Sequence, residues 1–167
     1  MFNHKKEFSK IYDKNINQIY RFVFLKVSSR EKAEDLTSEV FTRGWNRFKD
    51  GKKIDNVRAF LYRVARNLII DHYREKGRVR TISTEDVSIK DPGIGIEEKA
   101  EISSDFNQVR LALFKVKDDY KDVVIMRYLD QLSISEIAEA MDKSEGAVRV
   151  MIHRALNTLK SEVNKKI

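Results

Sequence analysis

The side chains in this sequence that could do chemistry are mainly cations at helical spacing, and the chemistry they suit is recognition of nucleic acid. Arg149, Val150, His153 and Arg154 fall on one face of a predicted helix that begins after Ser144. An arginine on such a face can donate two hydrogen bonds to a guanine edge, while contacts to phosphates add affinity without sequence preference. We therefore expect this face to lie against a DNA duplex.

Residues 132–159, which contain this helix, have the pattern of a helix-turn-helix. Ser133 and Glu136 have the spacing of a capping box that starts a short first helix, and Ser144 is a good N-cap for the second. The turn between them places Asp142 where positive φ is needed, which Asp tolerates. The second helix should pack six apolar residues inward: Val148, Met151, Ile152, Ala155, Leu156 and Leu159. A plain helical hairpin is the alternative interpretation.

A second cationic face lies on the helix predicted over residues 57–74. At 100° per residue one side of this helix is apolar, and the other is basic and without a carboxylate. The basic side holds Ala59, Arg63, Arg66, Asn67, Ile70 and Arg74, with Tyr62 and Tyr73 at its edge. Cations and rings in this arrangement suit the phosphates and the stacked or extruded bases of a single strand. An ordinary solvated face rich in arginine is the alternative.

Two helices are predicted before this one, the first over residues 4–27. Ser28 and Glu31 have the spacing of a capping box that starts the second. An apolar stripe follows on the second helix: Ala33, Leu36, Thr37, Val40, Phe41, Gly44, Trp45 and Phe48. A separate polar stripe has the same helical spacing: Asp35, Ser38, Glu39 and Thr42. A polar stripe is usually a solvated face, and a surface for a protein partner is the other interpretation.

The composition argues against several classes of function. The 167 residues contain no Cys and no Gly-rich phosphate loop, and the three His lie on different predicted elements. We therefore expect no enzyme, no metal, no cofactor and no small-molecule substrate. Because the sequence has no Cys, no apolar run of 18 residues and no secretory leader, we expect a soluble, cytoplasmic protein.

Charge divides the chain into two positively biased modules and an acidic connector. Residues 1–80 carry a net charge of +10, residues 81–105 carry −5, and residues 106–167 carry +2. Apolar spacing of three and four nearly throughout predicts an all-α fold. The expected organisation is an N-terminal helical domain over 1–77, an acidic linker over 78–105, and a C-terminal domain over 106–167 that contains the helix-turn-helix. Two further helices are expected in the C-terminal domain, over residues 106–116 and 120–129.

Three stretches of the chain carry a family resemblance: AEDLTSEVFTRGW (33–45), RAFLYRVARNLIIDHYR (58–74) and DDYKDVVIMRYLDQLSISEIAEAMDKSEGAVRVMIHRAL (118–156). In their order and spacing they resemble the extracytoplasmic-function group of bacterial sigma factors, which direct RNA polymerase to promoters. The resemblance implies that the first domain binds core polymerase and captures the melted minus-ten element. It also implies that the last domain reads the minus-thirty-five element as duplex DNA.

Carried over by position, the resemblance implies three sets of site residues. Core polymerase would be bound by Asp35, Ser38 and Glu39, although Ser38 stands where related sigma factors often have Gln. The minus-ten set is Asn56, Arg63, Arg66, Asn67 and Arg74. The minus-thirty-five set is Ser144, Arg149, Val150, His153 and Arg154. Ala147 stands where the family commonly has Thr, which removes a hydroxyl contact to phosphate.

The resemblance also implies the partners of the protein. These are core RNA polymerase, promoter DNA and an anti-sigma factor, which in this group is frequently membrane-bound and could hold the protein at the inner membrane face. A free-standing helix-turn-helix transcription regulator is the alternative function. Such a regulator would carry an effector pocket or a dimer surface in residues 1–80, where this sequence has a basic helix instead.

Overall fold

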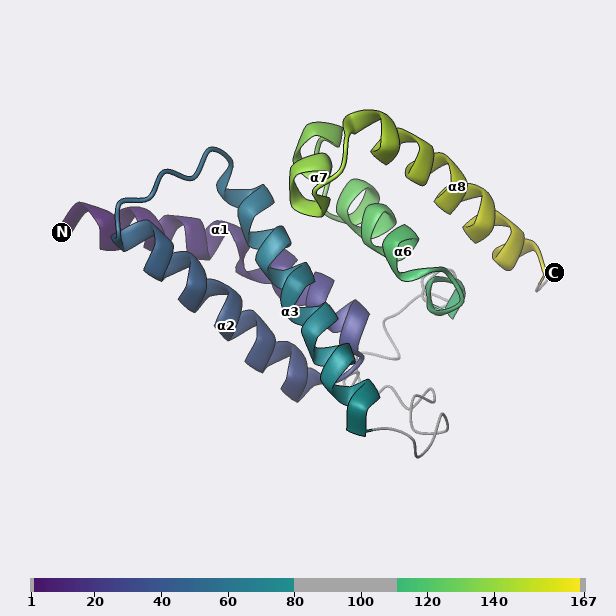
Figure 1. The fold of residues 1–167 in the computed structure, drawn as a ribbon, viewed down its shortest axis with the longest axis horizontal. Coiled ribbons are helices and arrows are strands. Elements are labelled where there is room, and N and C mark those ends of the chain that lie inside the picture. The colour runs from purple at the N-terminus through teal and green to yellow at the C-terminus, as the bar shows by residue number, and fades with distance from the viewer. Residues whose placement is uncertain (1, 80–110, 166–167) are drawn as a thin grey trace. The chain divides into compact units, whose positions relative to one another are not determined.

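The computed structural model describes residues 2–79 and 111–165, and within these two ranges the chain is helical and has no strand (Figure 1). This confirms the all-α prediction. The helices are α1 (Phe2–Val27), α2 (Arg30–Lys49), α3 (Val57–Val79), α6 (Asp118–Val124), the π-helix η1 (Ile125–Leu129), α7 (Ile134–Met141) and α8 (Glu145–Asn164). Residues 111–114 are also helical. The chain divides into two compact units, Met1–Gly93 and Ile94–Ile167.

Parts of two predicted segments lie outside the described residues. Of the expected linker, only residues 78 and 79 are described, and they continue α3 rather than leaving the helix at Gly77. The helix expected over residues 106–116 is described from residue 111 onward, and it ends at residue 114.

The N-terminal unit consists of α1, α2 and α3, each of which packs against the other two (Figure 1). Its core includes fully buried residues from all three helices: Ile19, Phe22, Val23, Val40, Leu61 and Tyr62. The rings of Phe22 and Tyr62 meet edge to face with centroids 5.3 Å apart, a favoured geometry for aromatic pairs. The unit is therefore held together by one shared apolar core.

Two predictions about the exposed side of α3 are wrong. Ala59 and Tyr62, which were expected on the basic side and at its edge, are both fully buried. The physical reason is that α3 packs against two helices, so its buried sector is wider than the single stripe read from the sequence. Tyr62 is consequently not available to stack on a base.

The turn between α1 and α2 differs from the predicted capping box. Ser28 has φ 55°, and its N–H donates to the carbonyl of Phe24 at 2.8 Å, so Ser28 closes α1. Ser29 is the residue in extended conformation, and its hydroxyl accepts from the N–H of Lys32 at 3.3 Å. The N-cap of α2 is therefore Ser29, because the left-handed conformation of Ser28 excludes it from that role.

Gly44 permits a close approach at the centre of this unit. A Cβ at this position would lie 3.2 Å from Cδ2 of Leu61 on α3 and 3.5 Å from the ring of Phe8 on α1. The first distance is tighter than an ordinary carbon–carbon contact, so a methyl group here would require the Leu61 side chain to shift by a few tenths of an ångström. At Gly44, α2 therefore packs closely against both Leu61 of α3 and Phe8 of α1.

The C-terminal unit supports its helix-turn-helix on α6 and η1, which contact α8 and α7 respectively. The helix expected over residues 120–129 exists but begins at Asp118 and changes to a π-helix at Ile125. Two hydrogen bonds join Leu132, which follows η1, to residues of η1. The N–H donates to the carbonyl of Met126 at 2.8 Å, and the carbonyl accepts from Nη1 of Arg127 at 3.0 Å.

The helix-turn-helix forms as its local signals predict. The hydroxyl of Ser133 accepts from the N–H of Glu136 at 3.0 Å, and the carboxylate of Glu136 accepts from the N–H of Ser133 at 2.9 Å, which completes the capping box. Asp142 ends α7 with φ 55° and ψ 50°, the left-handed conformation expected there. Ser144 then caps α8 by accepting from the N–H of Ala147 at 3.1 Å.

The inward face of α8 is narrower than predicted. Val148 and Ala155 are fully buried, but Leu156 is 38% exposed and does not belong to the buried set. The supporting helices α6 and α7 cover only one side of α8, which explains why a residue at the margin of the apolar stripe remains at the surface.

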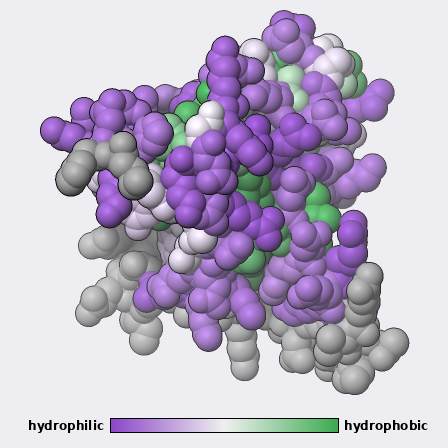
Figure 2. Space-filling model, turned by 60° about the vertical axis from the view of Figure 1, so that its left-hand side comes forward, coloured by the Kyte–Doolittle hydropathy of each residue, from purple (hydrophilic) through white to green (hydrophobic). Residues whose placement is uncertain are grey.

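Hydrophilic residues cover most of the face shown in Figure 2, and hydrophobic residues show in the gaps between them. In the described parts of the chain, no helix combines the length and the apolar composition that a membrane crossing requires.

Candidate nucleic-acid and protein interfaces

One candidate DNA surface is the outer face of α8. Arg149, Val150, His153 and Arg154 are all exposed, as the sequence predicts, and Val150 is 47% exposed although it is aliphatic. Ser144 lies at the start of the same helix, and its hydroxyl is already engaged as the N-cap. This face therefore offers two guanidinium groups, an imidazole and an apolar side chain to a partner, a set that suits base edges in a major groove.

The structure adds to this face a residue that sequence reasoning missed. Asn157 follows His153 by one helical turn and places its Nδ2 3.3 Å from Nε2 of the imidazole. The signal was available in the sequence, because residues four apart share a helix face. The exposed Lys160 lies one further turn along. The polar surface of α8 thus extends beyond the predicted residues.

A second candidate DNA surface runs along α3. Arg63, Asn67, Ile70 and Arg74 are exposed and recur at spacings of three and four, so they form one stripe. Ile70 is 38% exposed within this polar stripe. Arg66, predicted for the same surface, is half-buried at its margin.

The electrostatics of α3 differ from the prediction of a basic side without carboxylates. Asp71 places its Oδ1 4.0 Å from Nη1 of Arg74, and both side chains are largely exposed. Burial, followed by the nearby cations Lys76 and Lys32, lowers the pKa of His72 below its ordinary value. His72 is therefore mainly neutral at pH 7, and the positive charge of this helix comes from its arginines and lysines.

The predicted aromatic edge of this surface is reduced to one ring. Tyr73 is 40% exposed, and its hydroxyl donates to the backbone carbonyl of Lys26 at the end of α1. This hydrogen bond ties α3 to α1 and leaves only part of the ring accessible to a partner.

Asn56, predicted to contact DNA, has a structural function at the start of α3. Its Oδ1 accepts from the N–H of Ala59 at 2.9 Å, and its carbonyl accepts from the N–H of Phe60 at 3.0 Å. These are the contacts of an N-cap, which satisfy donors that the first helical turn leaves unpaired.

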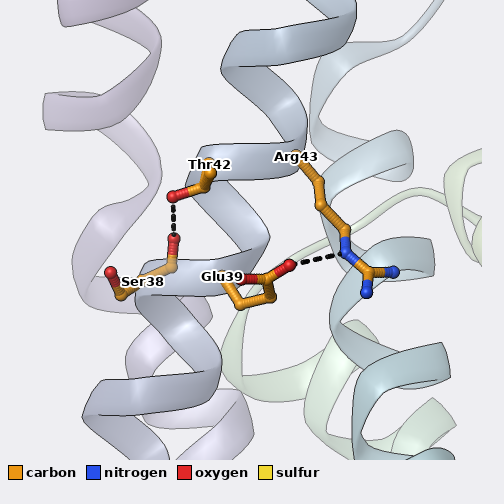
Figure 3. A network of polar contacts seen from close by, with 4 residues as sticks. All are labelled: Ser38, Glu39, Thr42 and Arg43. Atoms are coloured by element: carbon orange, nitrogen blue, oxygen red, sulfur yellow. Dashed lines mark hydrogen bonds and ion pairs between the residues drawn. The ribbon is translucent and has the colours of Figure 1, made fainter.

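The polar stripe of α2 is a candidate protein interface. Asp35, Ser38, Glu39 and Thr42 are all exposed, as predicted. Figure 3 shows Ser38 and Thr42 on the side of α2 that faces α1, and Glu39 with Arg43 on the other side. The Thr42 hydroxyl donates to the carbonyl of Ser38 at 2.9 Å.

Arg43 is a member of this surface that sequence reasoning missed. Its Nε donates to Oε1 of Glu39 at 2.9 Å, and both side chains are about half exposed. The spacing of four between Glu39 and Arg43 was the available signal. The pair reduces the negative charge that Glu39 presents to a partner, although an exposed pair of this kind is weak and readily exchanged.

Comparison with protein families gives two matches, one in each unit. The model of sigma-70 region 2 matches residues 11–79, and the model of sigma-70 region 4 matches residues 106–159. Together they cover most of the chain. The first match contains α3 and the α2 stripe, and the second contains α7 and most of α8.

Among curated proteins, the chain is 30% identical over 157 residues to the ECF RNA polymerase sigma factor BldN of Streptomyces coelicolor. That match covers 91% of this chain but only 58% of the relative's length. The ECF RNA polymerase sigma factor SigX of Bacillus subtilis is 26% identical over 164 residues, which cover 95% of this chain and 84% of the relative.

Two solved structures share the fold. The sigma factor RpoE, crystallised with the anti-sigma factor NepR from Bartonella quintana, aligns with a TM-score of 0.78 and 22% identity, over 95% of this chain and 98% of that one. CnrH, in complex with the cytosolic domain of CnrY, aligns with a TM-score of 0.71 and 17% identity, over 98% and 91% of the two chains.

The first prediction separates the capping role of Asn56 from a DNA-contacting role. Asn56→Ser keeps an N-cap oxygen but removes the amide, whereas Asn56→Ala removes both. We expect Asn56→Ala to destabilise the protein by about 1 kcal/mol in urea unfolding, and Asn56→Ser to stay within a few tenths of wild type. If the amide also reads a base, both variants should lose the same selectivity for single-stranded DNA. Equal stability of the two variants would contradict the capping role.

The second prediction concerns base reading by α8. We expect Arg149→Ala or Arg154→Ala to weaken binding to the preferred duplex by about 1 to 3 kcal/mol and to relax preference at one base pair. Selection from a randomised duplex pool measures this change. Lys160→Ala is the control, because a lysine that contacts only phosphates weakens all sequences alike. If both arginine variants keep the base-pair preference of wild type, neither Arg149 nor Arg154 contacts the base edges that determine it.

Proposed function

The chain belongs to the ECF group of RNA polymerase sigma factors, and we propose that it binds core RNA polymerase and directs promoter-specific transcription initiation. In this proposal the N-terminal unit binds core enzyme through Asp35, Ser38 and Glu39. The stripe on α3 then holds the melted minus-ten strand, while the outer face of α8 reads the minus-thirty-five element as duplex.

The observation that carries this proposal is that each unit matches a different sigma region and each holds its own cationic surface. On α3 the exposed set mixes arginines with Asn67 and Ile70, which suits a strand whose bases are unstacked. On α8 the two arginines stand on a helix that follows a sharp turn, the arrangement by which a helix-turn-helix enters the major groove. A regulator with a single DNA site has no use for both surfaces.

The same proposal assigns the remaining partners and the cellular location. The two solved structures described above that share the fold are each in complex with another protein, NepR in one case and the cytosolic domain of CnrY in the other. We extend this to an anti-sigma factor for the present chain, which would hold it at the inner face of the membrane in the cytoplasm. The protein would have no catalytic step of its own, since the polymerase supplies the chemistry.

The third prediction tests the division of labour between this protein and the polymerase. Two small basic surfaces joined by a linker bind nearly independently unless a third body fixes their separation. The isolated protein should therefore bind promoter DNA weakly, with little preference and steep salt dependence, and core enzyme should convert this to specific binding. The measurement titrates a labelled promoter, mapped after overexpression, and a scrambled duplex at about 0.15 M salt with and without core enzyme. Tight, promoter-specific binding by the protein alone would favour the regulator.

The fourth prediction tests the acidic stripe. Asp35→Ala combined with Glu39→Ala should weaken binding to core polymerase, because two exposed carboxylates are lost from the contact surface. Loss of the Glu39–Arg43 pair should cost only about 0.2 to 0.5 kcal/mol of helix stability. The matched control is Asp71→Ala with Glu75→Ala on α3, which changes the net charge equally. Equal affinity for core polymerase in the two double variants would contradict the assignment.

A further inference from the structure

Two exposed polar side chains, His153 and Asn157, contact each other at the centre of the outer face of α8. At 100° per residue both lie on the side of the helix opposite the buried Val148 and Ala155. Helical side chains lean toward the N-terminus, so Asn157 reaches back over one turn and places its Nδ2 3.3 Å from Nε2 of His153. The amide is therefore in a position to orient the imidazole.

This contact engages one ring nitrogen of His153 and leaves the other to a partner. Within the described residues, Nδ1 of the ring has no hydrogen bond. A neutral imidazole carries one proton, on the nitrogen that does not accept a hydrogen bond. When the amide N–H of Asn157 donates to Nε2, that proton is on Nδ1, and Nδ1 becomes a donor.

The charged side chains beside the ring favour a donor at Nδ1. The ring is exposed, and α6 and α7 pack against the opposite side of α8, so these neighbours belong to its own helix. Within one turn of His153 they are Arg149 and Arg154, which offer only donors. A donor at Nδ1 suits the same kind of base edge as the arginines, one with acceptors such as N7 and O6 of guanine or O4 of thymine.

We propose that Asn157 is a positioning residue for base reading by His153: its amide donates to Nε2, keeps the proton on Nδ1, and so presents an N–H donor to an acceptor on a base edge. This inference rests on the proposed function and adds the hydrogen-bonding character of one base contact. An imidazolium also has a proton on Nδ1, and the amide of Asn157 can rotate to accept from its Nε2–H. The same donor is therefore presented whether the ring is neutral or charged.

The fifth prediction tests Asn157→Ala in the complex of the full chain with core RNA polymerase. Selection from a randomised promoter pool first identifies the base pair whose preference is lost in His153→Ala. At about pH 8, Asn157→Ala should weaken that preference about threefold to tenfold, because the single proton is then divided between the two ring nitrogens. At about pH 5.5 the variant should regain it, because both nitrogens of a histidine are then protonated. Wild type should keep the preference at both pH values.

Asn164→Ala is the matched control, because it removes an amide from the same face of α8 about two turns further along. It should behave like wild type at both pH values. Alanine forms helices better than asparagine, so both asparagine variants should fold.

Four outcomes would overturn the inference while leaving the proposed function intact. They are Asn157→Ala matching Asn164→Ala at pH 8, Asn157→Ala failing to recover at pH 5.5, wild type losing the preference on acidification, and His153→Ala keeping every base-pair preference. Failure of the wild-type complex to prefer promoter over scrambled duplex would instead overturn the proposed function.

Discussion

The packing of α2 against both α1 and α3 is the constraint on which the N-terminal unit depends. Gly44 lies at this junction, where a Cβ would be 3.2 Å from Cδ2 of Leu61 and 3.5 Å from the ring of Phe8. With its apolar stripe held against two helices, α2 turns its carboxylates outward. The same contact fixes the rotation of α3, so that Arg63, Asn67 and Arg74 share one exposed stripe. The positions of the candidate polymerase and single-strand surfaces are therefore consequences of one apolar core.

The N-termini of the helices impose the second constraint, because the N–H groups of the first helical turn have no partner within the helix and must be satisfied by other groups. Polar residues near the candidate sites satisfy them: Asn56 caps α3, and Ser144 caps α8. A residue that matches a family binding motif can thus already be required for folding. Substituting it would change stability and binding together, so the capping oxygen must be kept when its contact with DNA is tested.

The C-terminal unit illustrates how local signals produce a binding surface. The capping box at Ser133, the left-handed Asp142 and the cap at Ser144 together determine where α7 ends and α8 begins. Burial of Val148 and Ala155 then sets the rotation of α8 and turns Arg149 and Arg154 outward. Because the supporting helices cover only one side of α8, a long polar face that includes Asn157 remains available to a partner.

The sequence by itself determined the features that depend on neighbours along the chain. Helix identity, the helix-turn-helix and the exposed arginines of α8 follow from apolar spacing and capping, which act within four residues.

Only the tertiary structure decided which residues at the margins of the apolar stripes are buried. Ala59 and Tyr62 are enclosed because α3 contacts two helices, whereas Leu156 stays exposed because α8 is covered on one side. The position of the α2 cap was decided by backbone conformation, because Ser28 is left-handed and Ser29 is extended. The contacts that enclose Ala59 and Tyr62 join helices distant in sequence, and periodicity alone carries no information about them.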